Sequence, residues 1–245
     1  MKNLFNYDQV ESLGGRLQSD PRHVALAFPA GGRVVLVDPG VAIPESLTAA
    51  IVSRTMEALR VSHAVDQANA DQDLSASGKA NRLKSLESER LKALAKFEKT
   101  ASAIEDFATI SKLAEENLYM PEPVSNTPEA LDGQEIRAYY RGLEGASRTA
   151  ALEQLQQAPD ARHLLGLIRS PIPLGEPLQQ IVTSAWERHL AASKAAKFEE
   201  VHADRAVAAW ATNAVNQIRQ ILDGLEYHDA DKAMQIRPAT EARAA

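Results

Sequence analysis

Apolar residues recur every three or four positions over two long stretches of this chain, and both stretches are almost free of helix breakers. The first, residues 77–118, contains no proline, and Gly78 is its only glycine. In the second, residues 176–225, no proline follows Pro177 and no glycine precedes Gly224. This pattern predicts two long amphipathic helices.

Both stretches place their apolar residues at heptad-like spacing, which is typical of long helices packed side by side. The first stripe consists of Leu83, Leu86, Leu94, Phe97, Ala101, Ile104, Ala108 and Leu113. The second stretch has two registers, Leu178, Val182, Ala185, His189, Ala192 and Ala196, then Ala208, Ala211, Val215, Ile218, Leu222 and Leu225. The register changes near Phe198–Val201, where we expect a bend, a short break or a change of packing partner.

Near the N-terminus, two runs rich in β-branched and other apolar residues, His23–Phe28 and Arg33–Val37, flank the glycine pair Gly31-Gly32. A phosphate-binding loop would lead from glycines into a helix, whereas these glycines lead into a second strand. The pattern therefore predicts a β-hairpin over residues 23–37, with glycine supplying the positive φ of the turn. Because an isolated hairpin is not stable in water, we expect it to pack on the following helices or to pair with a neighbouring copy.

The remaining segments are shorter or more polar. Residues 44–65 have helical spacing, residues 66–79 are polar and predict a loop, and three prolines break the chain within 119–130. The predicted fold is mainly α, an elongated helical bundle with two long helices (about 77–118 and 176–225), short helices between them and a small N-terminal hairpin. In chain order we expect an N-terminal segment (1–43), a helical stem (44–118), a proline-rich linker (119–130), a short-helix region (131–172), a long C-terminal helix (173–228) and a polar tail (229–245).

The composition argues against several classes of protein and of functional site. The 245 residues carry a net charge of −6, which argues against a general nucleic-acid binder. There is no cysteine, which excludes disulfides, cysteine nucleophiles and thiolate zinc sites. Aromatic residues make up only 5%, which favours slim helices over a thick multilayer core. The sequence shows no secretory signal and no apolar run long enough to span a membrane, so we expect a cytoplasmic place of synthesis.

The sharpest metal-like pattern is Glu199-Glu200-Val201-His202, which places a carboxylate and an imidazole on one helical face. Di-iron bundles use two such motifs together with further glutamates, and this chain has no second one. A solvated helix face is the simpler interpretation. A metal site would require a second copy of the chain to complete it.

Two other acidic groups fail as metal sites. Asp71, Asp73 and Ser75 are spaced like the start of a calcium loop, but Ala76 and Arg82 stand where that loop needs glycine and glutamate. The cluster near the C-terminus is explained by a charged helix end; it consists of Glu226, His228, Asp229 and Asp231.

No serine has the surroundings of a catalytic nucleophile. Ser12, Ser77 and Ser147 each lie beside or near glycine, but none stands between two glycines at a strand-to-helix turn. We therefore predict no catalytic, cofactor-binding or metal residues, and no enzyme.

Residues 79–99 contain seven Lys or Arg and three Glu, a local positive charge in an acidic chain. This stretch could contact a phosphate backbone weakly or bind an acidic partner. Phe97 is its only aromatic residue, so base reading is not expected. A solvated helix face with i,i+3 and i,i+4 pairs is the simpler interpretation.

Large aromatic side chains on slim helices anchor either a core or an interface. The candidates are Trp186 and Trp210 in the last helix, and Tyr139 and Tyr140 in the short-helix region. A core position is the simpler expectation for each one. A helical hairpin leaves one side uncovered, so we expect some of them to face a partner.

Residues 160–195 resemble small helical proteins encoded among the virion genes of tailed bacteriophages. The resemblance rests on a short helix with Leu164-Leu165 and Leu167-Ile168, a proline break, and a long helix bearing Trp186 and His189. It implies a structural, internal, ejection-type or head–tail-region component of a virion, present in many copies and without catalysis.

The sequence thus predicts a non-enzymatic structural or assembly protein that forms homo-oligomers through its long helices and its hairpin. Its expected partners are copies of itself and other structural proteins, and its expected location beyond the cytoplasm is a virion. One alternative is a helical adaptor or regulatory protein that binds another protein in a groove. The other is a metal-binding protein whose site is completed between subunits.

Overall fold

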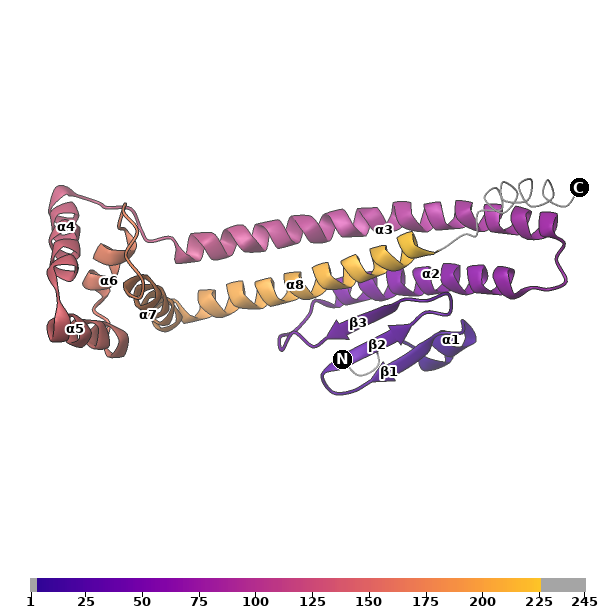
Figure 1. The fold of residues 1–245 in the computed structure, drawn as a ribbon, viewed down its shortest axis with the longest axis horizontal. Helices are drawn as coiled ribbons and strands as arrows, with labels where there is room; N and C mark the ends of the chain where they lie inside the picture. The colour runs from indigo at the N-terminus through magenta and orange to yellow at the C-terminus, as the bar shows by residue number, and fades with distance from the viewer. Residues whose placement is uncertain (1–3, 226–245) are drawn as a thin grey trace, which may run out of the picture. The chain divides into compact units, whose positions relative to one another are not determined.

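A computed structural model describes residues 4–225 of the chain. Within this range it has eight helices, two of them long, and a three-stranded antiparallel sheet near the N-terminus, which confirms the mainly α prediction. The described chain divides into two compact units (Figure 1), one from residues 4–109 with 206–225 and the other from Ile110–Arg205. The long helices α3 (Ala76–Tyr119) and α8 (Ala195–Gly224) contribute to both units, which are described separately below.

Each of the remaining helices and strands belongs to a single unit. The first unit contains α1 (Tyr7–Ser12), β1 (Arg16–Ser19), β2 (His23–Ala27), β3 (Arg33–Val37) and α2 (Glu45–Ala70). The second unit contains α4 (Thr127–Gly142), α5 (Gly145–Gln157), α6 (Ala161–Ile168) and α7 (Leu178–Ser193).

The sheet contains the predicted hairpin and one further strand. Strands β2 and β3 pair with His23 opposite Val37, and Gly31 and Gly32 both have positive φ in the turn between them. Strand β1 pairs with the other edge of β2, with Arg16 opposite Ala27. It was not predicted because its four residues, RLQS, include a single apolar side chain.

The sheet lies against helices of its own chain, one of the two alternatives expected for the hairpin. Val24, Leu26, Val34 and Leu36 are buried in one core cluster. Helices α2, α3 and α8 contribute side chains to the same core, and Figure 1 shows these helices beside the sheet. The helix residues at its centre are Ile51, Leu59, Phe97, Ala211, Val215, Ile218 and Leu222. All six apolar residues of the second predicted register, from Ala208 to Leu225, are buried.

The open edge of β3 is closed at its middle residue by a side chain of α8. The Val35 N–H donates to Gln217 Oε1 at 2.6 Å, and Gln217 Nε2 donates to the Val35 carbonyl at 3.0 Å. The side-chain amide thus replaces the backbone of a further strand. A sheet edge closed in this way is protected from pairing with another chain.

Replacing Gln217 by alanine is expected to lower the free energy of unfolding by about 1–2 kcal/mol, because two hydrogen bonds to a half-buried strand are lost. The amide of Val35 should exchange its hydrogen faster than in the parent protein. The exposed Gln220, one position beyond Arg219 on α8, provides the control, and Gln220→Ala should change neither quantity. Unchanged exchange at Val35 in Gln217→Ala would contradict the role of this amide.

The second of the two predicted long helices, residues 176–225, is divided into two helices in the structure. A break at Lys194 separates α7 from α8, a few residues before the predicted register change at Phe198–Val201. Lys194 leaves the helical conformation, with φ −128° and ψ 39°, while its N–H still bonds to the Leu190 carbonyl. No glycine or proline lies near this position, so the change of register is the sequence signal closest to the break.

The loop predicted over residues 66–79 is also shorter than expected. Helix α2 continues to Ala70 and α3 begins at Ala76. The Ser75 hydroxyl accepts the Gly78 N–H at 3.1 Å and so caps the start of α3. The polar residues that predicted a loop therefore include a helix cap.

The apolar stripe of α3 differs from the prediction at its C-terminal end. The seven-residue repeat that buries Ala101 and Ile104 continues to Ser111 and Leu118, whereas Leu113 is exposed. Because position 111 holds a serine, the sequence pattern predicts that the stripe continues through Leu113 instead. The side chain of Leu113 lies on another face of the helix.

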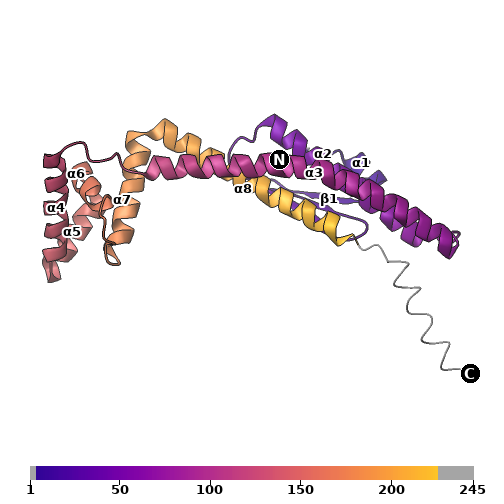
Figure 2. The same ribbon diagram turned by 90° about the horizontal axis from the view of Figure 1, so that it is seen from above.

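The core of the second unit is built from short helices packed on the end of α3, and Figure 2 shows α4, α5, α6 and α7 grouped together. Its buried residues are Leu118, Ile136, Tyr140, Leu155, Leu164, Leu167, Leu174, Leu178, Val182, Ala185, Trp186, Leu190 and Val201. The Trp186 indole N–H donates to the Tyr119 carbonyl at 2.9 Å. This bond ties α7 to the C-terminus of α3.

Candidate functional site

One face of α3 in the second unit exposes large apolar side chains. Ile110 and Met120 are each 65% exposed and Leu113 is 52% exposed. The Met120 N–H bonds to the Glu116 carbonyl, so the helical turn continues through this residue. At spacings of three and seven residues these side chains share one helical face, with the exposed Asn117 between them. We call these four residues the α3 face.

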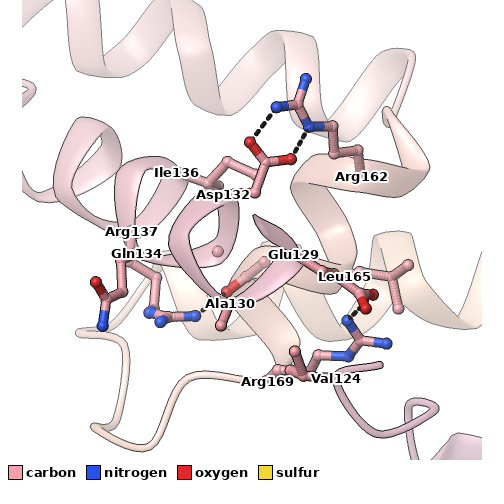
Figure 3. Close-up of a pocket in the computed structure, with 12 residues that line it drawn as sticks. Val124, Glu129, Ala130, Asp132, Gln134, Ile136, Arg137, Arg162, Leu165 and Arg169 are labelled. Atoms are coloured by element: carbon pink, nitrogen blue, oxygen red, sulfur yellow. Dashed lines mark hydrogen bonds and ion pairs between the residues drawn. The ribbon is translucent and has the colours of Figure 1, made fainter. Parts of the chain in front are cut away.

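A cavity of about 350 Å³ lies between α4 and α6 of the same unit (Figure 3). Its apolar wall is formed by Val124, Ala130, Ile136 and Leu165. Its polar side chains are Glu129, Asp132, Gln134, Arg137, Arg162 and Arg169. We call this space the α4–α6 cavity.

Close backbone contact brings α4 and α6 together beside the cavity. A Cβ on Gly166 would lie 2.9 Å from Ile136 Cδ1, so only glycine fits there without displacement of Ile136. A Cβ on Gly133 would lie 3.0 Å from Arg137 Nη1, which shows that the Arg137 side chain folds back over Gly133. The two glycines therefore allow Arg137 to reach across to α6.

The two acids of the cavity are both paired with arginine. Glu129 accepts from Arg169 Nη1 at 2.6 Å and from the Ser125 N–H and hydroxyl, each at 2.8 Å. The Arg169 bond and the Ser125 bonds lower the pKa of Glu129 to about 2. Asp132 accepts two bonds from Arg162, which lower the pKa of Asp132 and raise that of Arg162. Both carboxylates are therefore ionised at neutral pH.

Arg137 differs from the other two arginines. Its Nη1 donates to the Gly166 carbonyl at 2.9 Å, which is a neutral acceptor. Within residues 4–225, no carboxylate lies within ion-pair distance of its guanidinium. Among the described residues that line the cavity, three are arginines and two are acids, so the charge of Arg137 has no counterpart in this lining.

The histidine of the predicted E-x-x-H pattern has another partner. His202 Nε2 lies 3.1 Å from the Tyr119 hydroxyl, and its ring lies 4.2 Å from the ring of Phe198. The Tyr119 hydroxyl also lies 3.4 Å from Glu187 Oε1, and burial and Glu187 raise the pKa of Tyr119. Glu199 is exposed. His202 thus belongs to an aromatic junction of α3, α7 and α8.

The other candidate metal residues are not brought together. Over residues 4–225, no three His, Asp or Glu side chains are grouped so that they could hold a metal ion. The Asp71 carboxylate accepts the Asp73 N–H at 2.9 Å, within the turn between α2 and α3. Glu226, His228, Asp229 and Asp231, with the predicted tail 229–245, lie outside the described residues.

The basic stretch 79–99 has several partners within the first unit. Arg90 bonds to Glu87 and to the Leu222 carbonyl, and Lys96 pairs with Glu57 at 2.8 Å. The Lys79 ammonium donates to the Asn69 carbonyl at 2.5 Å. Phe97, the only aromatic residue of the stretch, is buried. Three of the seven basic side chains, Lys79, Arg90 and Lys96, therefore bind acceptors within the first unit.

The aromatic candidates divide between core and surface. Trp186, Trp210 and Tyr140 are buried within their own units. Tyr139 is exposed, and its ring lies 5.3 Å from that of Tyr140 in an edge-to-face arrangement. Neither tryptophan is therefore available at the surface of its unit as an anchor for a partner.

The serines considered as nucleophiles have structural surroundings. The Ser12 hydroxyl donates to the Gln9 carbonyl at 2.9 Å at the end of α1. Ser77 lies in the first turn of α3, and Ser147 lies in the first turn of α5, where it is exposed. None of these positions is a strand-to-helix turn.

A comparison with protein-family models, curated proteins and solved structures finds no match to this chain. No helix within residues 4–225 is both long enough and apolar enough to cross a membrane.

Proposed function

We propose that this protein is a non-enzymatic structural protein that assembles with copies of itself through the α3 face. The observation that carries the proposal is the exposure of Ile110, Leu113 and Met120 on one face of a helix whose other apolar stripe is buried. Adjacent exposed apolar side chains of this size favour burial against a partner. Burying them removes apolar area from water and supplies the driving force for association.

The pattern of the α3 face favours a second copy as the partner. Ile110 and Asn117 occupy one type of heptad position, and Leu113 and Met120 occupy the other. Isoleucine and leucine in these positions favour two-stranded helix pairs. A single asparagine in such a seam sets the register, since each amide can pair with the same residue of the other copy. The face therefore suits self-association.

The more specific form of the proposal is a component of a bacteriophage virion. It rests on the resemblance of residues 160–195, which form α6, the proline-containing connection and α7. In a virion the chain would be present in many copies and would contact other structural proteins. A helical adaptor that binds a different protein through the same face is the alternative.

Sedimentation velocity over an about hundredfold range of concentration tests the proposal, since self-association depends on concentration. The parent protein should form oligomers at high concentration. The double variant Ile110→Glu with Leu113→Glu should remain a monomer, because charged side chains then oppose each other in the seam. Leu91→Glu is the matched control, since Leu91 is similarly exposed, at 54%, on the same helix but in the first unit, outside the α3 face.

Two results would refute self-assembly through this face. A parent protein that is monomeric at every concentration would favour the adaptor. An oligomer that is unaffected by the double variant would place the interface elsewhere on the chain.

A further inference from the structure

We infer that the α4–α6 cavity is a binding site for a small molecule with one carboxylate on a short aliphatic chain. The Arg137 guanidinium would hold the carboxylate, and the apolar wall would hold the chain. This site is separate from the α3 face and does not depend on self-assembly. The inference rests on the charge balance of the cavity, the free donors of Arg137 and the composition of the wall.

The charge balance favours a monoanion. The pairs Glu129–Arg169 and Asp132–Arg162 are each neutral overall, which leaves the charge of Arg137. One carboxylate would neutralise it. A phosphate dianion would bring a second negative charge next to Glu129 and Asp132 and leave that charge uncompensated in a partly apolar space.

Arg137 has the donors that such a ligand needs. A guanidinium carries five N–H donors, and the Gly166 carbonyl accepts from Nη1 alone. The remaining donors form a planar fork that matches the two oxygens of a carboxylate. The bond to Gly166 also holds the guanidinium in place before a ligand arrives. Figure 3 shows the Gln134 amide extending to the same side of α4 as Arg137, where it offers a further N–H.

The wall of the cavity suits an aliphatic chain rather than a sugar or a base. Ile136, Leu165, Ala130 and Val124 present carbon atoms only through their side chains. A volume of about 350 Å³ is at the lower end of ligand sites and accommodates a chain of about five or six carbons. Among the residues that the structure describes, no aromatic side chain lines the cavity for stacking.

Calorimetric titration of the full chain with hexanoate tests the site. We expect a dissociation constant of about 1 mM, as is reasonable for a ligand with eight non-hydrogen atoms. Hexanol lacks the carboxylate and acetate lacks the chain, so each should bind at least about tenfold more weakly. Inorganic phosphate should not compete with hexanoate. Absence of hexanoate binding, equal binding of hexanol, or competition by phosphate would overturn the inference.

Three variants locate the binding. Arg137→Gln should weaken hexanoate binding at least about tenfold, because the charged donor is lost. Arg141→Gln removes an exposed arginine one turn further along α4 and should leave binding unchanged. Ala130→Leu keeps every charge but fills the space for the chain, so it should abolish hexanoate binding as well.

Circular dichroism of each variant shows whether the helices remain intact. If Arg137→Gln unfolds because the bond to Gly166 is lost, Ala130→Leu still tests whether hexanoate binds in the α4–α6 cavity. Full hexanoate binding by Ala130→Leu, or by a folded Arg137→Gln, would overturn the assignment.

Discussion

Phe97→Ala is expected to lower the free energy of unfolding by about 3–5 kcal/mol, the usual cost of truncating a fully buried phenylalanine. Phe97 is 1% exposed and lies in the core shared by α2, α3, α8 and the sheet. The Arg219 guanidinium lies over its ring at 5.8 Å and is held there by Glu98 and Glu105. Removal of the ring leaves a cavity and takes away the surface on which Arg219 rests.

Urea unfolding followed by circular dichroism measures this loss. Phe97→Leu keeps most of the volume and should cost less than about half as much. Leu91→Ala, at an exposed position of the same helix, should stay within about 0.5 kcal/mol of the parent protein. A loss for Phe97→Ala no larger than that of Leu91→Ala would show that α3 does not pack in this core as described.

Gly166→Ala is expected to destabilise the second unit by about 1–3 kcal/mol, because the new methyl group would overlap the Ile136 side chain. The added Cβ would lie 2.9 Å from Cδ1, 3.1 Å from Cγ2 and 3.2 Å from Cβ of Ile136. Three close atoms on one branched side chain cannot all be relieved by a single rotamer change. Helices α4 and α6 would have to separate, and the Arg137 bond to the Gly166 carbonyl would lengthen.

Thermal unfolding of two further variants tests this explanation. Gly142→Ala changes a glycine of α4 that has no atom within 4 Å of its added Cβ, and it should be neutral or stabilising by up to about 1 kcal/mol. Adding Ile136→Val to Gly166→Ala removes the closest atom, and it should recover part of the loss. Equal effects of Gly166→Ala and Gly142→Ala would refute a close contact between α4 and α6.

The elements predicted best from sequence are those with an unbroken period. Helix α3 was placed within one residue at each end, and the register from Ala208 to Leu225 is buried throughout. In these stretches every turn contributes an apolar residue, so the stripe is defined many times over. Strand β1 and helix α1 are too short for any period to emerge.

Other features depend on contacts that no local pattern records. The break at Lys194 lies in an alanine-rich stretch that favours helix, so tertiary packing decides it. Leu113 was assigned to the buried stripe because Ser111, which is buried, is not apolar. The α4–α6 cavity depends on Arg137 meeting Gly166, which is 29 residues further along the chain. The absence of a carboxylate partner for Arg137 within residues 4–225 is a property of the folded unit alone.

The discontinuous make-up of the first unit has a consequence for the order of folding. Its core joins Val24, Leu26 and Phe97 to Val215 and Ile218, and the whole of Ile110–Arg205 intervenes in the chain. The second unit consists of one continuous segment, so its core can form as soon as that segment leaves the ribosome. The first unit must close a loop of about a hundred residues before its core is complete. Until Gln217 has been synthesised and packs on the sheet, the edge of β3 stays open. During synthesis, the sheet is therefore made before the second unit but completed after it, and its strands are open to other chains for that interval.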